Sequence, residues 1–419
     1  MKTEEIKGKN ILILGFGREG EDTLNFIKEI GSFANITIAD KRENLSLSDK
    51  SLKLSLGDDY LKNIEEYDLI IKSPGIPIDR ITPLIKEGTI ITSQSDIFLD
   101  NVKGTVIGIT GTKGKSTTSS LITDILKKKG LDASLVGNIG EPTLKYLKDD
   151  NPDKIYIYEL SSFQLETVNK SPDISIILNL YKDHLDHHKN FKDYVNAKSK
   201  ITQFQKEDNI LIFNKEDPIV KEIASKSKAK KIPFNPKNDP LGIRKDITVP
   251  AEVLLIVSKI FDISDELIIE TISSFTPLPH RLENVGRYKG ITFYNDSAAT
   301  IPEAAISAIN KIGPDLDTLI TGGVDKGFSL KELSDKIVES SINNLILFPE
   351  TGKKIEEFVS GKLNIFHAKD MKTAVEIAFS KTKKGKSCLL APAASSFNMF
   401  KDYQERGNLF KKYVKDEKA

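Results

Sequence analysis

The sequence predicts an α/β protein of three domains, each built on a mainly parallel sheet. Short apolar runs of strand length alternate with segments of helical periodicity along the whole chain. Two of these runs lead straight into glycine-rich turns that open a helix, which is typical of sheets that bind nucleotides. With 419 residues the chain is also too long for one hydrophobic core. We therefore expect domains at residues 1–100, 101–284 and 285–419.

The composition narrows the class of protein. Hydrophobic residues make up 39% and charged residues 29% of the chain, as in globular proteins, and the formal net charge is only +1. This balance predicts neither a nucleic-acid nor a membrane partner. A single cysteine, Cys388, lies in an apolar run and is expected to be inert core. The start of the chain has no apolar region of a signal peptide, so we expect a cytoplasmic protein.

The first domain opens with a strand at 10–14 that runs into Gly15-Phe16-Gly17-Arg18-Glu19-Gly20. This turn fits G-x-G-x-x-G, an amphipathic segment follows to about residue 30, and a second strand at 36–40 ends in Asp40. Such a unit binds a dinucleotide, with the acid placed for a ribose hydroxyl. By itself the motif is weak, because any phosphate-bearing nucleotide could use the turn.

The central domain begins at Gly108-Ile109-Thr110-Gly111-Thr112-Lys113-Gly114-Lys115-Ser116-Thr117-Thr118. A strand precedes this loop and a helix follows it to about Gly130. The arrangement suits a nucleotide triphosphate: loop amides face the phosphates, Lys115 reaches the β/γ oxygens, and Ser116 can ligate Mg²⁺. Five residues separate Gly108 from Gly114, one more than the strict motif allows. The alternative is an ordinary glycine turn.

Further polar residues follow the strands of the central domain. Glu159 ends a strand after the phosphate loop, where a Mg²⁺-directed carboxylate belongs. The segment 181–188 holds three of the five histidines in a spacing that fits no standard zinc site. Of these, His184 is the candidate for a place near Mg²⁺ and phosphate, and His187 and His188 are expected to be exposed. Lys198 lies on a helix at 191–204, where a lysine is normally solvated.

The remaining elements are placed by the same periodicities. Strands are expected at 69–71, 154–158, 174–179, 209–213, 291–294, 318–321, 345–348 and 387–390. Helices are expected near 251–261, 265–275, 302–311, 330–338, 351–358, 374–380 and 399–414. Residues 226–250 are rich in Lys, Pro and Asn and are expected to be irregular. Turns or polar clusters follow several strands, at 73–75, 295–297, 321–327 and 391–396, where parallel sheets bind ligands.

Taken in order, the motifs resemble those of the Mur ligases, the ATP-dependent amide-forming enzymes of peptidoglycan synthesis. The resemblance covers essentially the whole chain. Its most specific parts are Gly111–Thr117, Gly137-Asn138-Ile139-Gly140, Glu159–Gln164, Asp183-His184-Leu185-Asp186, Pro279-His280-Arg281, Asn295-Asp296-Ser297 and Gln404-Glu405-Arg406-Gly407. It implies a Rossmann-like N-terminal domain that binds a UDP-sugar, a central P-loop ATPase domain, and a Rossmann-like C-terminal domain that binds the amino acid.

The resemblance also implies roles for individual residues. UDP-sugar binding falls to Gly15, Gly17, Asp40, Arg42, Ser73, Pro74, Gly75 and Asn138, which removes the need for NAD. ATP binding falls to Gly111, Thr112, Lys113, Gly114, Lys115, Ser116, Thr117, His280, Arg281 and Asp296. Thr300, Lys326, Ser396 and Tyr403 stand where the family holds the amino acid. Ser116 and Glu159 would serve a first Mg²⁺, and His184 with a carbamylated Lys198 a second. Lys115, Glu159, His184 and Lys198 are thus the implied catalytic set.

The implied reaction adds D-glutamate to UDP-N-acetylmuramoyl-L-alanine through an acyl phosphate, catalysed by a monomer. An alternative is a Mur-type ligase for L-glutamate or another amino acid, since Ala298 replaces a family lysine. Residues 246–252 lack the family's asparagines, a departure that concerns how adenine or metal is held. An NAD-dependent oxidoreductase would leave Lys115, Glu159 and His184 without a task. A non-catalytic nucleotide-binding protein would not need all four of Lys115, Glu159, His184 and Lys198.

Overall fold

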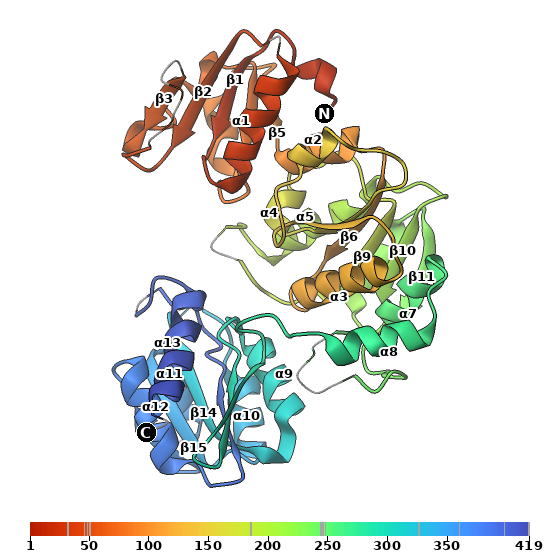
Figure 1. The fold of residues 1–419 in the computed structure, drawn as a ribbon. Coiled ribbons are helices and arrows are strands. Elements are labelled where there is room, and N and C mark those ends of the chain that lie inside the picture. The colour runs from red at the N-terminus through yellow and green to blue at the C-terminus, as the bar shows by residue number, and fades with distance from the viewer. Residues whose placement is uncertain are drawn as a thin grey trace. The chain divides into compact units, whose positions relative to one another are not determined.

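The computed structural model describes residues 1–31, 33–45, 47, 49, 52–184, 187–243, 247, 249–325, 327–359, 361–397 and 399–417. The chain forms two compact units. The first comprises residues 1–241 and 249–272 and contains two sheets; the second comprises residues 242–248 and 273–419 and contains one. Helices pack on both faces of the central sheet and of the sheet in the second unit (Figure 1). This three-sheet α/β architecture confirms the predicted fold class, while the exact domain boundaries stay predictions.

The first sheet has the strand order β3-β2-β1-β4-β5, and all its strands are parallel. The chain crosses from β1 to β2 through α1, and then passes to the other side of β1 for β4. The bounds are β1 Asn10–Leu14, α1 Arg18–Ile30, β2 Asn35–Asp40, β3 Lys53–Leu56, β4 Leu69–Lys72, β5 Ile90–Thr92 and α2 Gln94–Asn101. Because strand order reverses at β1, the turns after β1 and β4 face one crevice, the usual ligand position in such sheets.

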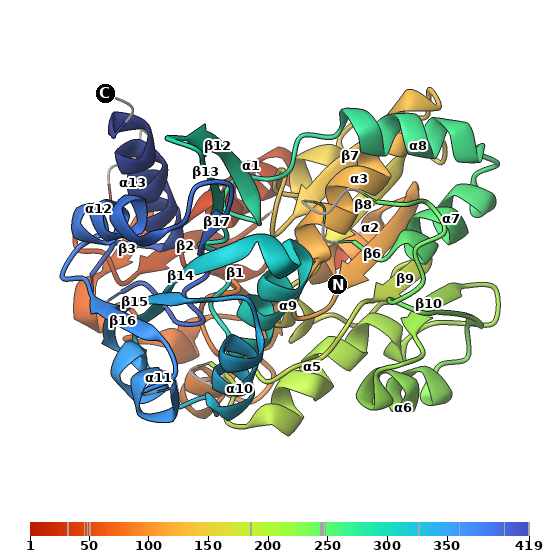
Figure 2. The same ribbon diagram turned by 90° about the horizontal axis from the view of Figure 1, so that it is seen from below.

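The central sheet is also fully parallel, with the order β11-β10-β9-β6-β8-β7. Figures 1 and 2 show α3 and α5 on either side of β6. Its strands are β6 Thr105–Thr110, β7 Ala133–Gly137, β8 Ile155–Glu159, β9 Ile174–Ile177, β10 Ile210–Asn214 and β11 Lys230–Phe234. Its helices are α3 Lys115–Lys128, α4 Ser162–Leu165, α5 Phe191–Gln203, α6 Pro218–Lys226, α7 Ala251–Ile260 and α8 Asp265–Ser274.

The sheet of the second unit has the order β12-β13-β17-β14-β15-β16, in which β12 alone runs antiparallel to its neighbour. Its strands are β12 Glu283–Tyr288, β13 Ile291–Asn295, β14 Leu316–Gly323, β15 Asn344–Glu350, β16 Asn364–His367 and β17 Ser387–Leu390. Its helices are α9 Pro302–Ile312, α10 Lys331–Glu339, α11 Thr351–Val359, α12 Met371–Lys381 and α13 Tyr403–Asp416. Cys388 is fully buried in β17, as expected.

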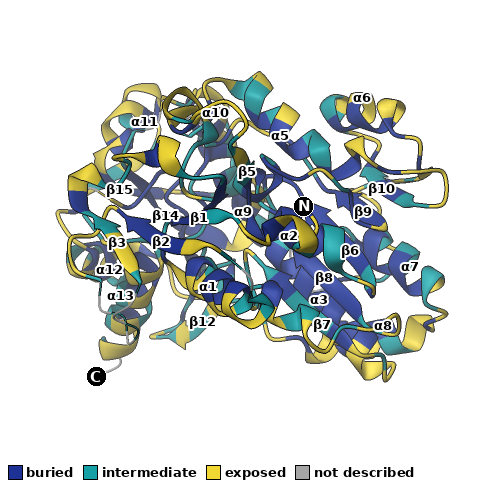
Figure 3. Ribbon diagram, turned by 90° about the horizontal axis from the view of Figure 1, so that it is seen from above, coloured by how far each residue is buried: buried dark blue, intermediate teal, exposed yellow. Residues whose placement is uncertain are grey.

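Burial follows the strand and helix periods. The inner strands are buried along nearly their whole length, and helices such as α1 expose one face only (Figure 3). Polar side chains start several helices: Ser93 before α2, Asn190 before α5 and Asp217 before α6 each accept a backbone N–H. Short 3₁₀ turns complete the chain: η1 Thr3–Ile6, η2 Gly57–Asp59, η3 Ile64–Glu66, η4 Ile78–Arg80, η5 Thr82–Leu84, η6 Leu144–Leu147 and η7 Gly313–Asp315.

Two expectations about the elements are wrong. Residues 230–234, expected to be irregular, form β11 and pair with β10. Because β11 is an edge strand, it tolerates both the exposed lysines and Pro233, which cannot donate a hydrogen bond. The last helix begins at Tyr403 rather than at residue 399, because the Asp402 side chain caps it by accepting from the Glu405 N–H. Among the described residues, no helix is long and apolar enough to cross a membrane.

Candidate functional site

The phosphate loop joins β6 to α3. Gly111 (φ 153°) and Gly114 (φ 86°) have backbone conformations that favour glycine, and a Cβ on Gly111 would lie 3.0 Å from Leu178 Cβ. Asn179, after β9, braces the loop: its carbonyl accepts from the Thr112 N–H at 2.8 Å, and its side chain bonds both N–H and C=O of Lys113. These hydrogen bonds hold the loop in a fixed conformation. The N-terminal turn of α3 begins at this loop, and its free N–H groups favour an anionic ligand there.

Lysines gather around this loop. The Lys115 ammonium donates to the carbonyls of Gly111 and Thr112, at 2.8 and 3.1 Å. Lys198, on α5, is 2% exposed and donates to Gly111 O at 3.0 Å and Thr110 Oγ1 at 3.2 Å. Burial, and then the nearby Lys115 charge, hold the pKa of Lys198 well below its ordinary value, although Asp183 and Glu159 oppose this. The prediction that a helix lysine here is solvated is wrong, because α5 packs Lys198 against the loop.

The lowered pKa of Lys198 matters for its chemistry, because it favours the neutral amine over the ammonium. An ammonium has no lone pair, whereas a neutral amine is a nucleophile. A depressed lysine pKa is a common sign of a functional amine. The surroundings of Lys198 therefore suit covalent modification of its nitrogen.

Acidic groups lie at the ends of the neighbouring strands. Glu159 is fully buried at the end of β8, and its Oε1 accepts from Asn138 Nδ2 at 2.7 Å. In the described part of the chain its Oε2 has no hydrogen-bond partner. A buried carboxylate oxygen left without a donor is unfavourable unless a cation satisfies it. Glu159 and the buried Ser116 at the start of α3 thus fit a hard divalent cation such as Mg²⁺.

The histidine segment follows β9. His184 adopts the left-handed conformation (φ 55°), and its side chain, 41% exposed, lies 3.7 Å from the buried carboxylate of Asp183. Its ring packs edge-on against Phe163 at a centroid distance of 4.8 Å. A partly exposed imidazole beside a buried acid has the chemistry of a metal ligand. Asp183 also lies 3.7 Å from Lys113 Nζ, which ties the segment to the phosphate loop.

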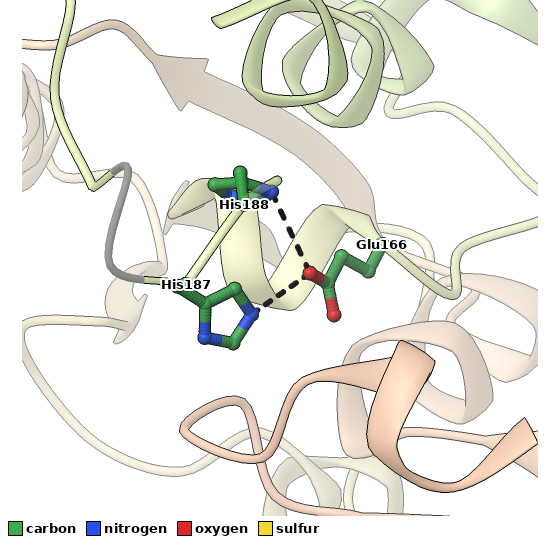
Figure 4. Close-up of side chains that lie close together, drawn as sticks. All are labelled: Glu166, His187 and His188. Carbon is green, nitrogen blue, oxygen red and sulfur yellow. Dashed lines mark hydrogen bonds and ion pairs between the residues drawn. The ribbon is translucent and has the colours of Figure 1, made fainter. Parts of the chain in front are cut away.

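The expectation that His187 and His188 are exposed is wrong. The side chains of His187 and His188 are 7% and 4% exposed, and both face the carboxylate of Glu166 (Figure 4). His187 Nε2 lies 2.8 Å from Glu166 Oε1, and His188 Nδ1 lies 3.7 Å from the same atom. From the sequence, a polar run is interpreted as a solvated loop, and nothing in it reveals Glu166, the acid directly after α4 that these rings contact.

Residues from the first and central sheets line a cavity of about 500 Å³. Most of the residues predicted to bind a UDP-sugar lie there: Gly15, Gly17, Asp40, Arg42, Ser73, Pro74 and Asn138. Gly75 follows the same turn but does not line the cavity. Gly15 must be glycine (φ 88°), because a Cβ would lie 2.8 Å from the Ser73 side chain.

Asp40 and Arg42 form the charged wall of this cavity. Arg42 donates Nε to Asp40 Oδ1 at 2.8 Å and Nη2 to Oδ2 at 3.0 Å, and the Phe16 N–H donates to Oδ2 at 2.7 Å. The hydrogen bond from Arg42 is the main reason that the pKa of Asp40 falls to about 2. The Asp40 carboxylate is thus ionised at all physiological pH values and holds Arg42 in place.

The remaining predicted residues lie in the second unit. The Asp296 carboxylate accepts from the Leu282 N–H at 3.0 Å, and Asn295 Nδ2 lies 3.0 Å from His280 Nδ1. His280 is buried, which lowers its pKa, and its ring centroid lies 6.1 Å from that of Tyr403. Arg281 lies beside His280, and the buried Ser396 and the half-buried Thr300 follow β17 and β13. Lys326 lies outside the described residues.

Three residues near these sites were given no role of their own from the sequence. Tyr194 is fully buried and its hydroxyl lies 2.8 Å from Thr112 Oγ1, so it supports the phosphate loop. Its helical spacing with apolar residues concealed this role. Asp183 lies between Lys113 and His184. Arg406 is fully buried and donates to the carbonyls of Ser297 and Ala394, and so joins two strand ends of the second unit.

Comparison with known proteins agrees with this geometry. The model of the Mur ligase middle domain matches residues 109–270. A UDP-N-acetylmuramoylalanine–D-glutamate ligase of Acetivibrio thermocellus is 32% identical, over 98% of this chain and 97% of that protein. The ligase of the same name from Caldanaerobacter subterraneus is 33% identical, over 98% and 99% of the two chains.

Solved structures share the fold at lower identity. MurF ligase from Thermotoga maritima in complex with ADP is 18% identical, with a TM-score of 0.59 over 99% of this chain and 97% of that one. UDP-N-acetylmuramate-alanine ligase MurC from the same organism is 17% identical, with a TM-score of 0.59 over 98% and 100% of the chains. The phosphate loop, the buried acid and the near-complete alignment with the curated relatives lead to one assignment: this chain belongs to the Mur ligase family.

Proposed function

We propose that this Mur ligase uses ATP to join D-glutamate to the alanine carboxyl of UDP-N-acetylmuramoyl-L-alanine, a step of peptidoglycan precursor synthesis. The observation that carries the proposal is the near-complete alignment, at about a third identity, with ligases named for this reaction. The site supports it independently, because a phosphate loop, a buried acid and a buried lysine meet at one sheet edge. The names of these relatives include D-glutamate, and we therefore propose D-glutamate as the amino acid that is added.

ATP is the phosphoryl donor in this proposal. The residues Gly111, Thr112, Lys113, Gly114, Lys115, Ser116 and Thr117 would cradle its phosphates, with their amides and the α3 N-terminus facing the negative charge. In the second unit His280, Arg281 and Asp296 are proposed to contact the nucleotide. The Lys115 ammonium, which donates to the carbonyls of Gly111 and Thr112, is proposed to turn to the phosphates when the nucleotide binds.

Two Mg²⁺ ions fit the chemistry of the donors. The unpartnered oxygen of Glu159 and the hydroxyl of Ser116 would hold the first, and His184 with Lys198 the second. For the second ion Lys198 is proposed to be carbamylated, since its amine is buried, has a lowered pKa and lies beside Lys115, whose charge would stabilise an anion. When bound, Mg²⁺ neutralises negative charge on the transferring phosphoryl group.

The proposed reaction has two chemical steps, and Lys115 assists the first. The alanine carboxylate attacks the γ-phosphorus of ATP, which forms an acyl phosphate and releases ADP. The glutamate amine attacks the activated carbonyl, loses a proton, and phosphate leaves from the tetrahedral intermediate. Lys115 would offset charge that develops on the phosphoryl oxygens, and the preformed loop avoids reorganisation during the transfer.

Substrate recognition is divided between the units. The cavity lined by Gly15, Gly17, Asp40, Arg42, Ser73, Pro74 and Asn138 is proposed to hold the sugar nucleotide. Gly75 is proposed to act through the turn it shares with Ser73. Thr300, Lys326, Ser396 and Tyr403 are proposed to hold glutamate. A monomeric cytoplasmic enzyme remains our prediction.

Phosphate release tests this proposal. Purified protein is incubated with ATP, Mg²⁺ and UDP-N-acetylmuramoyl-L-alanine, and amino acids are added one at a time. We expect release that requires both the sugar nucleotide and D-glutamate. Release with L-glutamate or another amino acid instead would keep the mechanism and assign a different specificity, which Ala298 makes the alternative to test. No release with any pair contradicts the function.

A further inference from the structure

Four charged or titratable side chains meet outside the proposed magnesium sites. Lys72, whose side chain is 0% exposed, lies 3.2 Å from Glu166 Oε2, and the other oxygen of Glu166 faces His187 and His188 (Figure 4). Ser162 Oγ lies 3.0 Å from His188 Nε2, so both rings are fixed. We refer to Lys72, Glu166, His187 and His188 as the Glu166 network.

The members of the network lie next to residues of the proposed site. Lys72 ends β4 and directly precedes Ser73 of the sugar-nucleotide turn. The backbone N–H groups of His187 and His188 both donate to the carbonyl of His184, at 3.1 and 3.0 Å. Glu166 thus joins a strand of the first sheet to the turn that carries the proposed metal ligand.

His184 needs such support because its backbone is strained. A positive φ of 55° is unfavourable for a histidine and persists only where the surroundings fix it. The two hydrogen bonds to its carbonyl come from residues whose side chains are anchored on Glu166 and Ser162. Without these anchors the turn could relax toward an ordinary conformation, and the imidazole of His184 would lose its direction.

We propose that Glu166 is a positioning residue for the ligase reaction: by anchoring His187 and His188 it holds His184 in its left-handed, metal-facing conformation. The inference deepens the proposed function and rests on it, since it concerns the second ion of that site. Glu166 touches no substrate in this role and acts through the turn.

An alternative is that Glu166, His187 and His188 bind a metal ion themselves. One ligand atom from each of Glu166, His187 and His188 lies within 4.8 Å of the others. The ammonium of Lys72 argues against this, because it already balances the charge of the Glu166 carboxylate, and a divalent cation would meet its repulsion. We therefore favour an ion-paired anchor, and the experiment includes a metal arm.

The test measures Mn²⁺ affinity in the presence of ADP by electron paramagnetic resonance, with Mn²⁺ standing in for Mg²⁺. We expect Glu166→Leu to weaken the affinity at least about fivefold, the scale of a lost indirect support of a ligand. In a protein that already carries His184→Ala, adding Glu166→Leu should not weaken Mn²⁺ affinity further, since Glu166 acts only through the His184 ligand. His187→Gln, which keeps a donor to Glu166, should stay near wild type, whereas His187→Leu should match Glu166→Leu.

A second variant separates positioning from general stability. Lys72→Met/Glu166→Leu removes both buried charges, and we expect it to regain the Tm lost in Glu166→Leu while its Mn²⁺ affinity stays weak. Recovery of affinity together with Tm would overturn the proposal, as would additive losses with His184→Ala. The matched control is Glu222→Gln, which removes an exposed ion pair with Lys226.

Two further outcomes are decisive. If one equivalent of Zn²⁺ raises the Tm of the wild type but not of Glu166→Leu, the network is a metal site and the positioning proposal fails. The Mn²⁺ measurements do not depend on turnover, so they remain valid if phosphate release fails. In that case the proposed function falls and the role of Glu166 in holding His184 is still decided.

Discussion

Two glycine-rich turns, Gly15–Gly20 after β1 and Gly108–Thr118 around the end of β6, use the same backbone arrangement with different charges. Each joins a buried parallel strand to the start of a helix and so presents N–H groups to an anion. At the first turn one acid, Asp40, is neutralised by Arg42 in the wall of a cavity. At the second, lysines and buried acids crowd together, and Lys198 is buried with them.

The difference shows that the turn provides the anion site and that the surrounding strands decide its chemistry. In the proposed function the first turn binds through its shape and the Asp40–Arg42 ion pair, which suits a substrate that is only held. The second concentrates charge of both signs where phosphoryl transfer is proposed, which suits catalysis. Substitutions at the second turn should therefore affect turnover, and substitutions at the first should affect substrate affinity.

The largest expected effect is that of Lys115→Ala. It should lower phosphate release by at least about a hundredfold, because a charged donor to the transition state is lost. The fold should remain, since the partly buried ammonium bonds carbonyls of the loop and contributes little to the hydrophobic core. Steady-state phosphate assays and thermal unfolding would measure the two properties. Lys128→Ala, at the other end of α3 in an exposed ion pair, is the control. An inactive Lys115→Ala protein that is also unfolded would contradict the prediction.

Lys198→Ala sharpens the comparison by removing the buried amine. We expect activity to fall at least about tenfold, and added acetate to restore part of it, because a small carboxylate can take the place of the carbamate as a ligand. The rate of phosphate release by Lys198→Ala, measured with and without acetate, would show whether the carboxylate restores activity. Lys192→Ala, on the exposed side of α5, should respond to neither change. Full activity of Lys198→Ala would remove the carbamate from the mechanism.

Arg42→Ala tests the first turn. The KM for the sugar nucleotide should rise about tenfold, as for the loss of a charge-assisted hydrogen bond, while the KM for ATP stays unchanged. Initial-rate measurements with each substrate varied separately would show this. The exposed neighbour Lys41 provides a control in Lys41→Ala. If Arg42→Ala changed mainly kcat, the division between a holding turn and a catalytic turn would be wrong.

The smallest effect concerns pH. Because the folded pKa of Asp40 is depressed to about 2, the ionised carboxylate contributes stability above its unfolded pKa of 3.8, and this contribution is lost as the pH falls through about 2. Asp40→Asn should therefore be less stable than wild type at pH 7, by about 1–3 kcal/mol. The two unfolding curves in urea should converge below pH 3.8. A constant difference down to pH 2 would mean that shape and not charge sets the contribution of Asp40.

The sequence predicted much of the fold because the inner strands are short apolar runs and the helices are periodic. It placed Lys115, Ser116 and Glu159 correctly at one sheet edge, because strand–turn–helix order alone brings strand ends together. It failed at β11, where an edge position tolerates a polar strand that contains Pro233. The prediction also failed for His187 and His188. Their side chains are buried and face the carboxylate of Glu166, which lies about twenty residues earlier in the chain.

The sequence by itself determined the family, the alternation of strands and helices, and the two anion-binding turns, because these depend on residues that are neighbours in the chain. Only the tertiary structure decided which charges are buried together. Burial against the phosphate loop lowers the pKa of the Lys198 amine, and Glu166 is paired with Lys72 from the other sheet of its unit. Desolvation and ion pairing depend on contacts between distant segments, and no local pattern encodes them.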